Sequence, residues 1–237
     1  MLLAFVDTPQ RHERLTVFPV VSADEPQLSY LLMVDALRKG FLTVEESRPG
    51  EPPCFIARNQ GTQPVLILDC EAVEGANFSF TTNQSVLLGP SSVTRVPGFC
   101  AKSGKWNCLE LERRFSPHLD DFPLLDDQVG ILAFLGQHLL GLDVLGCPQL
   151  YGDLHRRLLT GDLVTAENAG EAECLEEPAE ETEIQALAMA LEGAERVAAP
   201  CVGHGEYTTI QGQVTGGELR HNGHLVHLSV FPNGIAA

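Results

Sequence analysis

The chain has 237 residues, of which 44% are hydrophobic and 20% are charged, so it is long enough for a sizeable core and lacks the composition of a disordered chain. Its formal net charge is -17, and the residues from Leu159 onward hold thirteen acidic side chains against only Arg196 and Arg220. Nucleic acid and an anionic membrane surface are therefore disfavoured as partners, because both are bound through basic patches.

The first part of the chain is predicted to form short strands. Residues 15–21 are rich in β-branched and aromatic residues, and similar runs recur between glycine and proline turns. Residues 27–39 have the apolar spacing of a short helix that ends before Gly40. Further strands are expected at 41–47, 54–59, 65–70, 85–88 and 93–96.

The middle of the chain is predicted to be helical, because its apolar residues recur three and four positions apart. Aspartate and threonine side chains precede two of these stretches and can cap the free N–H groups of a first helical turn. Helices are expected at 128–142, capped by Asp126 or Asp127, at 149–167, interrupted by Gly161, and at 182–197, capped by Thr182, with a glutamate-rich solvated connector at 167–183.

The end of the chain returns to strands. Residues 206–214 and 218–230 alternate apolar and polar side chains, and Asn222-Gly223 is a strong signal for a two-residue hairpin turn. The expected fold class is α+β, mainly antiparallel β as a sandwich or open barrel, with about three helices packed on it. We expect one domain over 1–237, in which a helical insert at about 126–198 lies within a β core from about 15–106 and 204–231. The alternative is that the helices form a separate subdomain.

Targeting and cysteine patterns favour a cytoplasmic protein. The first residues lack the basic region of a signal peptide, and no stretch approaches the roughly 20 apolar residues of a bilayer span. The seven cysteines are an odd set without a Cys-x-x-Cys pair, so they suit buried free thiols in a reducing compartment rather than disulfides or a zinc site. No metal and no cofactor is expected.

Two short segments contain candidate functional residues. Glu71 and Glu74 follow the apolar strand that begins at Val65, and a carboxylate at a strand end can act as a general base or accept a sugar hydroxyl. Trp106 could stack on a ring while Lys105 lies near a phosphate. The alternatives are solvated loop acids and a tryptophan of the core.

The histidines concentrate near the end of the chain. His221 and His224 would face each other across the predicted turn, which makes a metal site conceivable, although an exposed hairpin tip without metal is the preferred interpretation. His227 would be either a core histidine or part of a pocket, on the strand face of Leu225, Ser229 and Phe231. His204 lies in a glycine-flanked loop that either presents a functional side chain or is an ordinary turn.

Six segments are informative through their order along the chain: 15–19, 30–46, 70–76, 96–100, 104–106 and 225–231. Together they resemble a bacterial family, the ADP-ribosylglycohydrolase and rhodanese-phosphatase superfamily associated protein domain. The family tends to have a polar run after Gly75-Ala76, where this chain has Asn77-Phe78-Ser79-Phe80, and usually has arginine in place of Lys105. If that run holds an anionic ligand, the resemblance implies that this member has changed or lost that function.

The family name implies a role near ADP-ribose or NAD metabolism without fixing an activity. The first hypothesis is a protein that binds a nucleotide-derived small molecule through Glu74, Asn77, Lys105 and Trp106. The second is a hydrolase of such a compound, with Glu71 as base and His204 or His227 assisting. The third is a noncatalytic protein-interaction module. Whether the protein is an enzyme, and its oligomeric state, are left open by the sequence.

Overall fold

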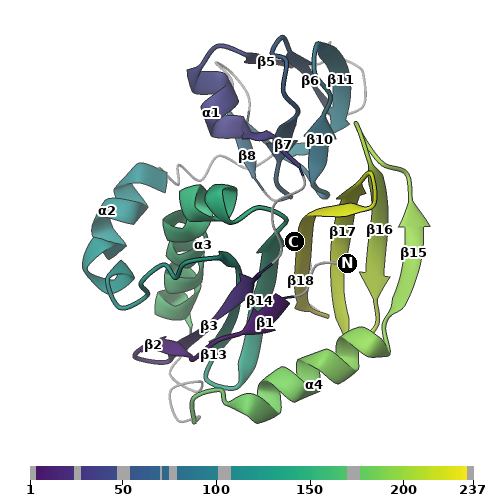
Figure 1. Cartoon of the computed structure of the whole chain (residues 1–237). Coiled ribbons are helices and arrows are strands. Elements are labelled where there is room, and N and C mark those ends of the chain that lie inside the picture. Colours follow the sequence, from purple (N-terminus) through teal and green to yellow (C-terminus); the bar gives the residue numbers. More distant parts are fainter. Residues whose placement is uncertain are drawn as a thin grey trace.

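A large antiparallel sheet is the main element of the computed structural model, which describes residues 4–23, 28–46, 54–69, 71–74, 79–100, 108–169 and 177–233 (Figure 1). Its central strands are buried on both faces. The strand order is β1 (Ala4–Val6), β3 (Leu15–Ser22), β13 (Gln128–Leu135), β14 (His138–Leu145), β18 (His224–Pro232), β17 (Val214–His221), β16 (Glu206–Gln211) and β15 (Glu195–Ala199), and β2 (Gln10–His12) also pairs with β3.

Three small sheets form a second layer above the large sheet in the view of Figure 1. Two of them share a core cluster, which contains Phe55, Ile67 and Leu88. All pairings in them are antiparallel except β4 with β7. The sheets are β4 (Leu31–Leu32), β7 (Val65–Ile67) and β10 (Val86–Leu88); β5 (Leu42–Glu46), β6 (Cys54–Asn59) and β11 (Ser92–Pro97); and β8 (Ala72–Glu74), β9 (Ser79–Thr81) and β12 (Phe99–Cys100).

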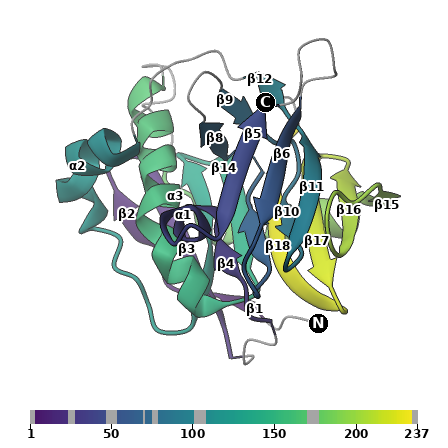
Figure 2. The same ribbon diagram turned by 90° about the horizontal axis from the view of Figure 1, so that it is seen from above.

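Two helices, α3 and α4, pack on opposite faces of the large sheet, whereas α1 packs against the small sheets. Ile131 and Ala133 belong to the core cluster shared with α3, whereas Leu132 and Phe134 belong to the cluster shared with α4. Figures 1 and 2 place α2 and α3 at the end of the molecule away from β15 and β16. The helices are α1 (Met33–Arg38), α2 (Cys108–Leu119), α3 (Pro148–Asn168) and α4 (Glu181–Glu192).

The predicted helix over 128–142 is wrong. These residues form the hairpin of β13 and β14, which turns at Gly136 with a φ of 57°. Every residue of β13 is buried, so its side chains make a continuous apolar run instead of alternating. Such a run satisfies helical spacing as readily as strand spacing. The predicted helical insert at 126–198 is therefore only partly helical.

The boundaries of the other predicted helices are adjusted. The helix expected at 149–167 is confirmed as α3, which continues through Gly161. The helix expected at 182–197 is shorter, because α4 ends at Glu192 and β15 follows. Its first turn begins at Glu180, whose N–H donates to the Glu183 carboxylate at 2.7 Å, so Thr182 is not the cap. The helix α2 was not predicted, and its sequence includes Pro117.

The α+β class with mainly antiparallel strands is confirmed. The predicted turn at Asn222-Gly223 is also confirmed, because both residues have positive φ angles, 51° and 79°, and His221 pairs with His224. The short helix expected at 27–39 is confirmed only in part: α1 begins at Met33, after the strand β4, and Gly40 follows the helix with a φ of 71°. Within the described part of the chain, no helix is both long enough and apolar enough to cross a bilayer.

Candidate functional site: a histidine between carboxylates

His227 lies on β18 where the large sheet faces the small sheets. The register of β17 and β18 shifts so that Leu219 pairs with His227 and Arg220 with Leu225, which leaves Val226 unopposed as a bulge. The bulge puts Leu225 in the cluster with α4, away from the face that His227 shares with Ser229. The prediction that Leu225 shares the face of His227 is therefore wrong.

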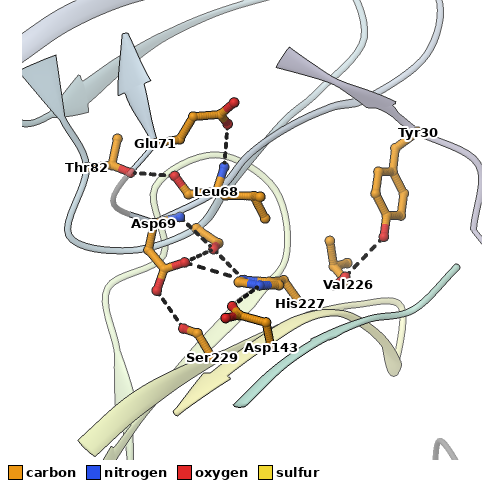
Figure 3. A network of polar contacts seen from close by, with 10 residues as sticks. Tyr30, Leu68, Asp69, Glu71, Thr82, Asp143, Val226, His227 and Ser229 are labelled. Carbon is orange, nitrogen blue, oxygen red and sulfur yellow. Dashed lines mark hydrogen bonds and ion pairs between the residues drawn. The ribbon is translucent and has the colours of Figure 1, made fainter. Parts of the chain in front are cut away.

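The two ring nitrogens of His227 face carboxylates from different layers (Figure 3). Nδ1 is 2.8 Å from the Ser85 hydroxyl and 3.6 Å from Asp69 Oδ1. Nε2 is 3.3 Å from Asp143 Oδ1, which is within ion-pair distance, but it has no aligned hydrogen-bond partner. The side chain of His227 is only 2% exposed. The site therefore contains a buried imidazole whose Nε2 is ion-paired with Asp143 but is not well aligned with that carboxylate for a hydrogen bond.

Ser85 and Asp69 form a fully bonded pair. The Asp69 N–H donates to the Ser85 hydroxyl at 3.0 Å, and the same hydroxyl donates to Asp69 Oδ1 at 3.3 Å. Ser229 donates to the other Asp69 oxygen at 2.5 Å. When His227 donates to the buried Ser85 hydroxyl, the one proton and both lone pairs of that hydroxyl are engaged in hydrogen bonds. Ser85 is therefore arranged to hold the imidazole and not to act as a nucleophile.

The carboxylates favour a protonated His227. Burial alone lowers the pKa of this histidine, but the Asp143 carboxylate, together with the charges of Asp69 and Glu71, outweighs burial and raises the pKa above its ordinary value. An imidazolium donates from both nitrogens, which matches Ser85 as acceptor at Nδ1. The geometry and the charges therefore agree on a cationic ring.

Glu71 holds the backbone next to Asp69. One of its oxygens accepts the Leu68 N–H at 3.0 Å, and the other accepts Nη1 of Arg157, on α3, at 2.7 Å. Thr82 donates to the Leu68 carbonyl at 3.0 Å, so both polar groups of this residue are bonded. Glu71 thus belongs to the same network as His227, as Figure 3 shows, and its bonds suit the positioning of Asp69.

Three charged groups of the network reach solvent. The exposed fraction of the side chain is 12% for Asp69, 21% for Asp143 and 28% for Arg157, against 4% for Glu71. Half-buried Asp162 on α3 lies near Asp143. Burial raises the pKa of the Asp162 carboxyl well above its ordinary value, and the charge of Asp143 adds to this effect. The network thus presents parts of two carboxylate side chains and one arginine side chain to solvent.

A second buried histidine, His155 on α3, has a structural role. Its Nε2 lies 2.8 Å from the Phe122 carbonyl, which can only accept, so Nδ1 accepts from the Tyr151 hydroxyl at 2.9 Å. Gln128 donates in turn to that hydroxyl at 3.0 Å. Burial lowers the pKa of His155, and this ring is neutral. All its bonds are satisfied within the protein, in contrast to His227.

The other predicted site residues are not part of this network. His204 is exposed, with its N–H bonded to the Leu87 carbonyl at 2.7 Å and its ring 6.1 Å from that of His221. Glu74 lies in β8, and its side chain is outside the described part. Asn77, Lys105 and Trp106 fall outside the described residues, so their predicted ligand contacts stay predictions. Among the residues that the structure describes, no group of three His, Cys, Asp or Glu could hold a metal ion.

Sequence reasoning missed most of the network. Asp69 stands at the end of the same apolar strand that drew attention to Glu71, so this signal was available. Asp143 was hidden by its assignment to a helix. No local signal marks Ser85, Arg157 or Ser229, because they matter only through residues distant in sequence.

The fold and the site define an α+β protein that holds a buried histidine between carboxylates where a small sheet meets a large one. The model of the ARPP-1 family, the ARG and Rhodanese-Phosphatase-superfamily-associated Protein domain, matches residues 5–119 and 110–231. The chain belongs to this family, and the resemblance seen in its sequence segments is confirmed. No match was found among the curated proteins or the solved structures.

Proposed function

We propose that the protein binds a small hydroxyl-bearing compound linked to ADP-ribose or NAD metabolism at Asp69, Asp143 and His227. The main support is that Asp69 and Asp143 bracket one buried imidazole, at 3.6 and 3.3 Å, while their side chains stay partly exposed. Carboxylates accept hydrogen bonds from sugar hydroxyls. Membership of the ARPP-1 family supports the link to ADP-ribose chemistry.

The network is suited to binding because it is held before a ligand arrives. Asp69 is fixed by Ser85 and Ser229, and Glu71 fixes the preceding backbone. Groups held in one geometry lose little entropy on binding. Nε2 of His227, which is not aligned for a hydrogen bond, and the partly exposed Asp143 carboxylate together offer a donor and an acceptor to one hydroxyl group.

Hydrolysis of the bound compound is a second candidate function. It is favoured by the ion pair between Nε2 of His227 and Asp143 at 3.3 Å, because a protonated imidazole can supply a proton and the neighbouring carboxylate can accept one. In that case Asp143, rather than Glu71, is the better candidate for the base, since both Glu71 oxygens are already bonded.

Thermal unfolding with and without ADP-ribose, NAD or ribose tests the binding proposal. A ligand at ten times its Kd stabilises by about 1.4 kcal/mol, which for a chain of this size raises the unfolding midpoint by about 3–6 °C. Asp143→Asn should reduce this rise. Asp153→Asn, an exposed aspartate on α3, should keep it. A flat response of the unsubstituted protein to all three compounds at millimolar concentration would contradict the proposal.

A further inference from the structure

The charged groups of the network carry a negative excess. The carboxylates of Asp69, Glu71 and Asp143 outnumber the guanidinium of Arg157 and the imidazolium of His227. If His227 lost its proton, the excess would grow. Ionisation of Asp162 would act in the same direction. The sign of the charge that a ligand meets is therefore negative in every protonation state near neutral pH.

The accessible side of the network has the same character. The side chains of Asp69 and Asp143 are partly exposed, and among the described residues neither forms an ion pair with an arginine or lysine. Arg157 is the accessible cation, and its Nη1 is committed to Glu71. A phosphate group placed against Asp69 and Asp143 would bring like charges together in a partly desolvated site.

An observation independent of the acidic residues also points to a ligand here. The side chain of His227 is 2% exposed, and its Nε2 has no aligned hydrogen-bond partner although it faces Asp143. The ion pair with Asp143 leaves this buried donor without an aligned hydrogen bond, so an acceptor that enters from outside the protein would stabilise it. A hydroxyl group can accept from Nε2 and donate to Asp143 at once, whereas phosphate oxygens can only accept.

We propose that the part of the ligand that enters between Asp69 and Asp143 is a hydroxyl-bearing sugar that is neutral or positively charged, and that any phosphate stays outside. The chemical class is a riboside whose bound half has no anionic group, such as an N-ribosyl pyridinium cation. This inference rests on the proposed function, because it names the ligand class of the same site.

Calorimetric titration of the full chain with two pentose compounds of opposite charge tests the inference. The probes are nicotinamide riboside, a cation, and ribose 5-phosphate, an anion. At low salt, nicotinamide riboside should bind at least about tenfold more tightly, because one favourable and one unfavourable contact with a carboxylate separate the two probes. Asp143→Asn should reduce this preference to less than about threefold, while Asp153→Asn should leave it unchanged.

Each other outcome has a defined meaning. If ribose 5-phosphate binds as tightly as nicotinamide riboside, or more tightly, the inference is overturned but the proposed function stands. If neither compound binds at millimolar concentration, the proposed function itself is contradicted. If Asp143→Asn does not fold, Asp69→Asn provides the same comparison. If the preference for nicotinamide riboside persists in whichever of Asp143→Asn and Asp69→Asn folds, the compounds bind elsewhere and the inference is overturned.

Discussion

The ion pair between Glu71 and Arg157 connects α3 to the backbone next to Asp69, so Arg157→Gln should destabilise the protein. The substitution leaves a carboxylate that is 4% exposed, with the Leu68 N–H as its only remaining partner among the described residues. Removing one member of a buried ion pair costs about 3–5 kcal/mol. Arg157 is 28% exposed, so water can replace part of its contribution, and we expect a loss of about 2–3 kcal/mol in the free energy of unfolding.

Urea denaturation monitored by circular dichroism measures this loss by linear extrapolation. Arg156→Gln is the matched control, because Arg156 is the preceding residue of α3 and is exposed, and its guanidinium makes solvent-exposed contacts, with Asp120 at 4.0 Å and with the Ser116 hydroxyl at 3.2 Å. It should change stability by less than about 0.5 kcal/mol. Glu71→Gln combined with Arg157→Gln should lose less than the two single losses added, with a coupling of about 1 kcal/mol or more. Equal, small losses for Arg156→Gln and Arg157→Gln would refute the role given to this pair.

Three further substitutions have predictable effects on the free energy of unfolding. The pKa of His227 is raised in the folded protein, so the protonated imidazole stabilises the fold. This stabilisation is fully present below about pH 6.5, the pKa of an unfolded histidine, and is lost as the pH rises through the pKa of the folded protein. His227→Gln should remove this decline of stability with pH. The pKa of Asp162 is also raised, so ionisation of this carboxyl opposes folding. Asp162→Asn should therefore be more stable than the unsubstituted protein at pH 8, and the difference in stability should disappear towards acid pH. Gly161→Ala should stabilise α3 by about 0.5–1 kcal/mol, because an added β-carbon meets nothing within 4 Å.

Urea titrations at several pH values check these expectations. A decline above pH 6.5 that persists in His227→Gln would mean that another group holds the proton. If Asp162→Asn were less stable at pH 8 than at pH 5, relative to the unsubstituted protein, the aspartate would be stabilising as an anion. Destabilisation by Gly161→Ala would show that the helix requires glycine there.

Local chemistry made part of the fold predictable. The turn at Asn222-Gly223 follows from two adjacent residues that tolerate positive φ, and α3 follows from its apolar spacing. The hairpin of β13 and β14 did not follow, because β13 is buried between helices that lie on both faces of the sheet. No window of sequence reports that a segment will be covered on two sides.

The site was predictable only in fragments. Glu71 and His227 were both identified from local pattern, and they do lie in one network (Figure 3). Asp143 becomes a partner of His227 only when β14 pairs with β18, and Ser85 is 142 positions from His227 in the chain. Such long-range partners are set by strand pairing and register, which composition and periodicity do not encode.

The most direct test of the binding site is the imidazole spectrum of the eight histidines, recorded by 1H–15N NMR while a riboside such as nicotinamide riboside is added. Comparison with His227→Gln assigns the resonances of His227. We predict that they move in proportion to saturation while those of His118, on α2, stay in place. Shifts confined to His204 and His221, with His227 unchanged at saturation, would contradict the account.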